Sequence, residues 1–105
     1  MLVNTAGATI EIVRTAAAGR SQPVTEGASV VFELPRESPV NLRIFDITGW
    51  TVRTLVAGRT LAAGRYSMPW NGQDESGSRL ASGVYFCRMT AGEFAATRRV
   101  VLIDR

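Results

Sequence analysis

The sequence predicts an all-β protein folded as an antiparallel β-sandwich of about seven strands. Short runs of β-branched, aromatic and aliphatic residues recur along the chain, and Gly, Asn and Asp residues separate them. No stretch shows a helical spacing of apolar residues over more than one or two turns. Frequent turns between short strands are typical of sandwiches. A chain of 105 residues, of which 46% are hydrophobic, is long enough to bury such a core in one domain.

Residues 1–28 are expected to form a connector, and residues 29–105 the sandwich domain. Thr9–Val13 has the alternation of a short strand, whereas Thr15–Gly27 is rich in Ala, Gly, Ser and Thr and contains Pro23. Two alternatives stay open for this segment: an edge strand of the sandwich, or the tail of a preceding domain. The start lacks the pattern of a signal peptide, and no apolar run approaches the roughly 18 residues of a membrane helix.

Two strands are predicted at the start of the domain. Val30–Leu34 is β-branched and aromatic, and it is closed by Pro35, which cannot continue a central ladder. Val40–Ile44 alternates strictly between apolar and polar residues. The residues expected to face inward are Val40, Leu42 and Ile44, and those expected to face outward are Asn41 and Arg43.

A hairpin is expected around Asp46 and Gly49. The strand Trp50–Val56 follows the preceding one so closely that the two should pair. Asp46 is expected to accept backbone N–H bonds rather than to act as an acid, because no base lies near it in sequence. Ala57–Gly64 is predicted to be a loop in which Leu61 is the only large apolar residue.

The stretch Met68–Met89 is predicted to form a strand, a turn-rich loop and a second strand. Tyr66, Met68 and Trp70 lie two apart, so a strand places them on one face. In the loop Asn71–Gly77, the aspartate is expected to bond backbone amides of its own turn, and the last glycine to adopt a positive φ.

The last two strands are predicted to form another hairpin. Cys87 lies on the alternating strand Gly83–Thr90, as a small core residue rather than a nucleophile. Ala91–Glu93 is a short hairpin loop. The final strand, Phe94–Ile103, ends in an unbroken apolar run from Val100. Its inward face stays open, because such a run can be buried on both sides.

The composition excludes several kinds of chemistry. All twelve basic residues are arginine, and the sequence contains no lysine and no histidine. An imidazole base, a histidine metal ligand and a Schiff-base lysine are therefore lacking. The single cysteine cannot form an internal disulfide or a multi-thiolate zinc site. We expect no catalytic residue, no metal and no cofactor. The arginines are spread along the chain, which argues against nucleic-acid binding despite the net charge of +3.

Several spaced motifs together resemble a known family. They are Phe32-x-Leu34-Pro35, Val40-x-Leu42-x-Ile44-Phe45-Asp46-x-x-Gly49, Trp70-Asn71-Gly72-x-Asp74-x-x-Gly77, Ser82-Gly83-Val84-Tyr85 and Arg98-Arg99-Val100-Val101-Leu102. Over about residues 29–105 the pattern is similar to the Ig-like domain of the flagellar hook-capping protein family. It is equally similar to related carboxy-terminal domains of exported bacterial proteins, including type IX secretion sorting domains. The residues expected to form its turns and core are Trp70, Asn71, Gly72, Asp74, Gly77, Gly83, Tyr85, Asp46 and Gly49.

The resemblance implies an Ig-like sandwich of seven strands that serves as an appended module without catalysis of its own. It implies a secreted or cell-surface location in a bacterium, and a role in domain docking, spacing, secretion sorting or surface attachment. The partners are then neighbouring domains of a larger polypeptide, or an export or attachment apparatus. Two alternatives stay open: the structural domain of a flagellar hook cap, and a carbohydrate-binding module with a polysaccharide as its partner.

Three groups of residues are candidates for ligand binding, each with a structural alternative. Trp50 is a candidate for stacking on a sugar, together with Tyr66 and Trp70, whose rings are otherwise expected in the core. The loop after β-strand residue Trp70 offers oxygen donors for calcium but lacks the spacing of an EF-hand. These donors are Asn71, Gln73, Asp74 and Glu75.

The third group consists of the outward arginines Arg43, Arg53 and Arg88. If their strands are neighbours, they form a basic stripe that could bind an anion. The alternative is that outward arginines keep the sheet soluble and protect its edges.

Overall fold

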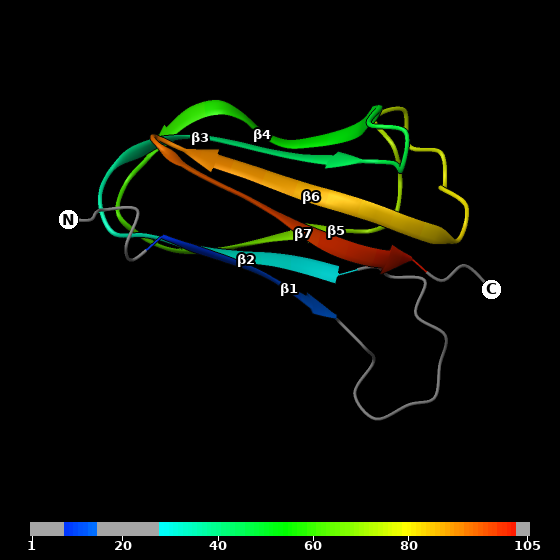
Figure 1. The fold of residues 1–105 in the computed structure, drawn as a ribbon, viewed down its shortest axis with the longest axis horizontal. Coiled ribbons are helices and arrows are strands. Elements are labelled where there is room, and N and C mark those ends of the chain that lie inside the picture. Colours follow the sequence, from blue (N-terminus) through cyan, green and yellow to red (C-terminus); the bar gives the residue numbers. More distant parts are fainter. Residues whose placement is uncertain (1–7, 15–27, 103–105) are drawn as a thin grey trace.

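The computed structural model describes residues 8–14 and 28–102, which form two stacked antiparallel sheets (Figure 1). The strands are β1 (Thr9–Arg14), β2 (Ala28–Leu34), β3 (Ser38–Phe45), β4 (Thr51–Leu61), β5 (Gly64–Trp70), β6 (Gly83–Ala91) and β7 (Phe94–Leu102). One sheet has the order β1-β2-β5 and the other β4-β3-β6-β7. The predicted all-β, Ig-like sandwich is thus confirmed. The connector residues 15–27 and Ile103 lie outside the described residues.

The chain passes back and forth between the two sheets. β3 and β4, and β6 and β7, form hairpins within one sheet, whereas β2, β4 and β5 are each followed by a strand of the other sheet. Such crossing connections are those of Ig-like sandwiches. β1, which falls within residues 1–28, pairs with β2 along its whole length and places Ile10 in the core.

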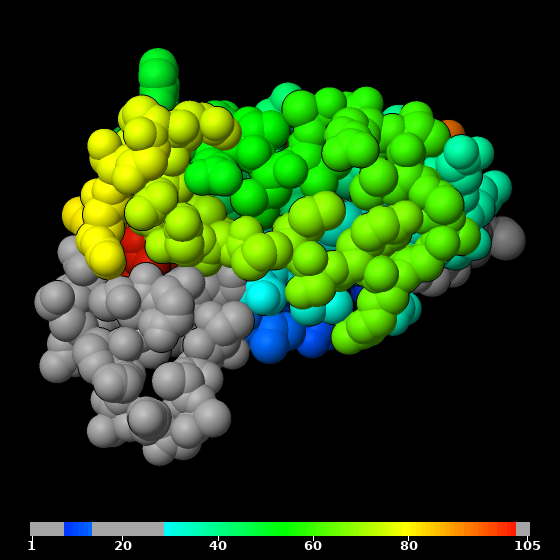
Figure 2. Space-filling view, turned by 180° about the vertical axis from the view of Figure 1, so that it is seen from behind, coloured from blue at the N-terminus to red at the C-terminus, as the bar shows by residue number. Residues whose placement is uncertain are grey.

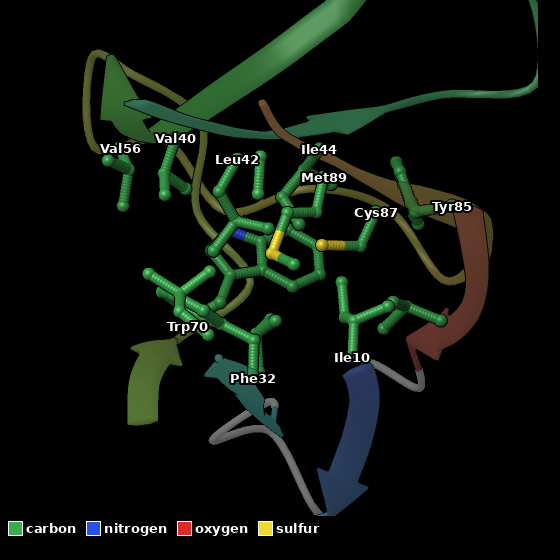
Figure 3. Close-up of a cluster of buried hydrophobic side chains, with 14 of the residues drawn as sticks. Ile10, Phe32, Val40, Leu42, Ile44, Val56, Trp70, Tyr85, Cys87 and Met89 are labelled. Atoms are coloured by element: carbon green, nitrogen blue, oxygen red, sulfur yellow. The ribbon is translucent and has the colours of Figure 1, made fainter. Parts of the chain in front are cut away.

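The core lies between the sheets, and strand alternation fills it. β3 follows the predicted pattern, with Val40, Leu42 and Ile44 buried. Figure 3 shows these side chains pointing across the sandwich toward Phe32 and Trp70 of the opposite sheet. The buried hydrophobic residues among those described are Ile10, Val30, Phe32, Leu34, Val40, Leu42, Ile44, Val56, Trp70, Tyr85, Cys87, Met89, Ala91, Val100 and Leu102.

The final strand has one buried face. Val100 and Leu102 are buried, while Val101 between them is 43% exposed. β7 is the last strand of its sheet, and only one side of that sheet packs against β1-β2-β5. The apolar run is therefore buried on one side only. The sequence alone did not decide which of its residues face inward.

The prediction of a loop over Ala57–Gly64 is wrong. β4 continues to Leu61, and only two residues separate it from β5. The pairing of β3 with β4 shifts register at three places, one of them between Val40 and Asn41, where Gly58 is the extra residue on β4. Gly58 has a φ of 65°, which a glycine adopts easily at a bulge. Gly58, which in the sequence suggested a loop, thus lies at a bulge within the edge strand β4.

The two ends of the sandwich carry different segments. β1 begins with Thr9 opposite Glu33, near the β2–β3 connection and the β6–β7 turn, and we call this the entry end. β7 ends with Leu102 opposite Gly83, near the β3–β4 turn and the loop 71–82, and we call this the exit end (Figure 1). Among the described residues there is no helix with the length and apolarity of a membrane span.

Candidate functional site

Two turns at the exit end share the pattern Asp-x-Ser/Thr-Gly-x. In the β3–β4 turn, the Asp46 Oδ1 accepts hydrogen bonds from the Thr48 amide (2.9 Å), the Thr48 hydroxyl (2.6 Å) and the Trp50 amide (3.1 Å). The Gly49 amide donates to the Asp46 carbonyl at 3.0 Å, and the Asp46 amide donates to the Trp50 carbonyl at 3.0 Å. Gly49 has a φ of 91°, which L side chains rarely adopt.

The loop between β5 and β6 repeats this arrangement. The Asp74 Oδ1 accepts from the Ser76 amide (3.0 Å), the Ser76 hydroxyl (3.0 Å) and the Ser78 amide (2.9 Å). The Asp74 amide donates to the Ser78 carbonyl at 2.9 Å, and the Gly77 amide donates to the Asp74 carbonyl at 3.0 Å. Gly77 has a φ of 88°, close to that of its counterpart in the first turn.

These hydrogen bonds keep both carboxylates ionised. The Thr48 hydroxyl is the main cause that lowers the pKa of Asp46, and the Ser78 amide is the main cause that lowers the pKa of Asp74. A general acid needs a pKa near the working pH, and its proton must face a substrate. The arrangement therefore fixes backbone conformation and does not favour proton transfer.

Two rings from opposite sheets hold the ends of the loop 71–82. The Trp70 Nε1 donates to the Gln73 carbonyl at 2.9 Å, and the Tyr85 hydroxyl donates to the Ala81 carbonyl at 2.8 Å. The bond from Tyr85 to a backbone group four residues upstream resembles the tyrosine corner of Ig-like sandwiches. The loop is thereby attached to the core at both ends.

Asn71 and Gly72 begin this loop. The Asn71 Oδ1 accepts from the Gln73 amide at 3.1 Å, and the Gly72 carbonyl accepts from the Leu80 amide at 2.9 Å. Gly72 is buried with a φ of 82°, and a Cβ there would lie 3.1 Å from the Leu102 side chain. In Figure 2 the loop (yellow) adjoins the end of β7 (red). The loop thus covers the last residues of the sandwich.

The same loop is also joined to the edge strand β4. The Glu75 amide donates to the Val52 carbonyl at 3.0 Å, and the Thr54 amide donates to the Glu75 Oε2 at 2.6 Å. Arg53 lies beside the loop, with its Nε 3.9 Å from the Glu75 Oε2 and its Nη1 3.5 Å from the Asp74 carbonyl. These contacts attach the middle of the loop to β4 of the four-stranded sheet.

The oxygen donors considered for calcium are engaged in this loop. Asp74 and Asn71 accept amide N–H groups, Glu75 accepts from β4, and the Gln73 side chain accepts from the Asn71 amide group at 3.2 Å. In the part of the chain that the structure describes, no three acidic or cysteine side chains come together. Calcium needs six to eight oxygens, and the hydrogen bonds of these residues fit the structural alternative, in which the side chains fix the loop.

The three rings considered for sugar stacking do not share a surface. Trp70 is 2% exposed, and Tyr66 stacks on Phe32 with ring centroids 5.1 Å apart. Trp50 is 73% exposed on the β3–β4 turn, whereas Tyr66 is partly buried. Ile47 of the same turn is equally exposed, and its place within a short turn is the sequence signal for that exposure.

Of the outward arginines, the structure brings two together. Arg43 and Arg88 are direct partners in the pairing of β3 with β6. Arg53 is turned toward the loop 71–82 instead. Arg99, which was not among the three predicted arginines, pairs with Phe86 and so stands diagonally to Arg88. The register of the β6–β7 hairpin was the signal that could have shown it.

Cys87 is fully buried on β6, as predicted for a small core residue. Burial raises the pKa of the Cys87 thiol to about 12. A thiol with such a pKa stays protonated at neutral pH. It is therefore a poor nucleophile in the folded protein.

The entry end carries a cleft of about 330 Å³ that sequence reasoning missed. Leu34 and Phe94 supply apolar surface, while Arg36, Glu37 and Glu93 supply charges. The residues that line the cleft come from three separate segments, so no local sequence pattern predicted it.

An antiparallel sandwich of three and four strands with a tyrosine corner defines the chain as an Ig-like domain. The chain belongs to the family of FlgD Ig-like domains, which it matches over residues 9–93. The crystal structure of FlgD from P. aeruginosa is similar in fold, with a TM-score of 0.57 and 24% sequence identity; the match covers 91% of this chain and 74% of that chain. No curated protein matches the sequence.

Proposed function

We propose that this chain is a non-catalytic structural module of the hook-cap-related type, which holds protein domains or subunits in a fixed relation outside the bacterial cytoplasm. Membership of the FlgD Ig-like domain family supports this role. The two aspartate turns, the ring anchors and the Glu75 contacts support it as well, because they stiffen the exit end without presenting a reactive group.

One observation carries the proposal: the chain enters and leaves the sandwich at opposite ends. β1 begins at the entry end, and β7 ends at the exit end beside the loop 71–82 (Figure 1). β1 and β7 lie against each other, and Figure 1 shows both strands running toward the exit end. Segments attached before and after the sandwich are therefore held apart by about the length of a strand.

The same geometry supports a second setting, that of an accessory domain in an exported bacterial protein. There the module would dock or space a neighbouring domain, or be read by an export or attachment apparatus. The family match supports the hook-cap setting more directly. The carbohydrate-binding alternative now depends mainly on Trp50, since Trp70 is buried and Tyr66 is partly buried against Phe32.

Small-angle scattering tests whether the module holds the segments before and after it apart in a line, which we call the in-line role. The full chain is fused to a small folded domain at each terminus, and the distance distribution between these domains is compared with that for a Gly/Ser linker of equal length. We expect a narrow distribution, whereas a flexible linker gives a broad one. A distribution as broad as that of the linker would overturn the proposal. As a control, the second domain is inserted at Gly92 of the entry end, which should shorten the separation.

A domain exchange distinguishes the two settings. The Ig-like domain of P. aeruginosa FlgD is replaced by the full chain, and a matched hybrid carries an unrelated β-sandwich. Hook assembly with the first hybrid only would support the hook-cap setting. If both hybrids are exported and neither assembles hooks, that setting is excluded.

A further inference from the structure

The outer face of the four-stranded sheet carries an unusual set of side chains near the exit end. Strand alternation places these residues opposite to the buried ones of β3, β6 and β7. We define the outer face by Arg43, Phe45, Val84, Phe86, Arg88, Arg99 and Val101. Phe45 pairs with Phe86, and Val84 pairs with Val101, so apolar pairs adjoin the arginines.

The arginines of this face have no acidic partner among residues 8–14 and 28–102. Arg43 and Arg88 are direct cross-strand partners, and like charges in that position are destabilising. Among the described residues, the ion pairs involve Arg53 and Arg65, and none involves these two arginines or Arg99. The repulsion between the two arginines lowers the stability of the isolated domain. A bound partner that supplies negative charge would offset this repulsion.

Exposed apolar residues accompany the charges. Val84 is 37% and Val101 is 43% exposed, and Ile47 and Trp50 project from the adjoining β3–β4 turn. Figure 2 shows this turn (green) standing out beyond the body of the domain. Arginine and aromatic residues next to an apolar centre are typical of protein interfaces, in which lysine is depleted.

We propose that the outer face, together with the β3–β4 turn, binds a partner protein whose surface places carboxylates around an apolar centre. The guanidinium groups suit paired carboxylates, because each can donate two parallel hydrogen bonds. A second copy of this chain does not suit the face, since a symmetric contact would set arginines against arginines. An anionic polysaccharide suits it less well, because its hydroxyl-rich chain would leave the exposed aliphatic side chains of Ile47, Val84 and Val101 without an apolar partner.

The inference deepens the proposed structural role, on which it rests, by naming the docking face and the partner's chemistry. The outer face spans three strands about 4.8 Å apart, so even with the β3–β4 turn its footprint is smaller than the roughly 800 Å² per partner of a standard interface and suits a weak or transient contact. The scattering measurement does not depend on these side chains. If peptide binding to the outer face fails while the distance between the fused domains is unchanged, the docking inference is wrong and the in-line role is still supported.

Binding of labelled peptides to the full chain tests the inference by fluorescence anisotropy. The probes are a ten-residue peptide of alternating Glu and Leu, the matched Gln-Leu and Glu-Ser peptides, and a heparin oligosaccharide. We expect the Glu-Leu peptide to bind at least about tenfold more tightly than either matched peptide. The triple variant Arg43→Gln, Arg88→Gln and Arg99→Gln should lose at least about tenfold in affinity.

A control variant removes the same amount of charge elsewhere, by Arg36→Gln, Arg65→Gln and Arg98→Gln, and should bind within about twofold of the parent. Thermal melts verify that both variants are folded. Equal losses in the two variants, or no binding of the Glu-Leu peptide at about 1 mM, would overturn the proposal. Tighter binding of heparin through the same three arginines would overturn it in favour of an anionic polysaccharide.

Discussion

The indole of Trp70 meets the phenol ring of Tyr85 edge-on, with ring centroids 5.9 Å apart and an interplanar angle of 67°. The two rings come from opposite sheets, and each donates a hydrogen bond to one end of the loop 71–82. The packing of the core therefore also determines where the loop lies. The loop, in turn, contacts β4 and the end of β7, so the exit end depends on this ring pair.

Trp70 should be among the most sensitive positions in the domain. Trp70→Ala removes a buried indole and is expected to cost about 3–5 kcal/mol of unfolding free energy. Trp50→Ala is the matched control and should change stability by less than about 0.5 kcal/mol, because Trp50 is exposed. Chemical denaturation of both variants measures these values. Similar costs at the two positions would contradict the assignment of one ring to the core and the other to solvent.

Alanine substitutions at two glycines of the same loop distinguish the stability cost of backbone strain from that of crowding. Gly77→Ala places a side chain at φ 88° with no atom within 4 Å of its Cβ, and should cost about 1 kcal/mol. Gly72→Ala adds a 3.1 Å contact with Leu102 to a similar strain, and should cost at least about 1 kcal/mol more. Urea titrations of both variants compare them. Equal costs would show that the loop does not pack on β7 as described.

The aspartate turns predict a loss of stability in acid. Because the folded pKa of Asp46 and Asp74 is lowered, their contribution is present above the unfolded pKa of about 3.9 and is lost as the pH falls through the folded pKa. Asp46→Ala and Asp74→Ala should thus melt below the parent at pH 7, and the difference should shrink below about pH 4. A constant difference from pH 7 to pH 2 would show that the charged carboxylates are not the cause.

The arginine pair of the outer face predicts a gain in stability on substitution. Arg88→Thr removes the like charge opposite Arg43 and introduces a β-branched residue, and is expected to add roughly 0.2–1 kcal/mol. Arg65→Thr is the control, because it removes an arginine that is paired with Glu33, and it should not stabilise the domain. The gain at Arg88 should become smaller at high salt. Destabilisation by Arg88→Thr would indicate that the arginine stabilises the isolated domain.

The Cys87 thiol should be unreactive in the folded protein. Its raised pKa, about 12, and its full burial both oppose alkylation at pH 8. Iodoacetamide labelling followed by mass spectrometry should proceed only as denaturant unfolds the chain. Since the folded pKa is raised, this thiol's contribution to stability is complete below its unfolded pKa of about 8.5 and is lost as the pH rises toward 12. Rapid labelling of the native protein would contradict the buried assignment.

Local sequence patterns were enough to locate the strands and the inward faces of the central ones. β3 alternates apolar and polar residues, and Val40, Leu42 and Ile44 are buried accordingly. β4 was predicted too short, because Gly58 at its bulge has the same sequence signature as a glycine in a loop. The inward face of β7 depends on its place at the sheet edge, and an unbroken apolar run carries no information about that place.

The surface features depended on the register between strands, which local patterns indicated for the β6–β7 hairpin but not for the pairing of β3 with β6 or for the bulged strand β4. Arg43 and Arg88 were expected to be neighbours only if their strands paired, and Arg53 was expected beside them. The bulges of β4 and the loop residue Glu75 instead draw Arg53 away, and the β6–β7 register brings Arg99 into the group. The pairing of β3 with β6 and the contact of Arg53 with Glu75 join segments that are distant in sequence, so residue spacing alone could not predict them.

The most direct test of the in-line account is the distance between the start of β1 and the end of β7 in the full chain. Spin labels at Thr9→Cys and Val101→Cys, in a Cys87→Ala background, allow electron double resonance to measure it. We predict a narrow distribution centred at roughly 30 Å, about nine residues of strand, and a clearly shorter distance for the control pair Thr9→Cys and Glu93→Cys at the entry end. Equal distances for the two pairs, or a broad distribution for the first, would contradict the account.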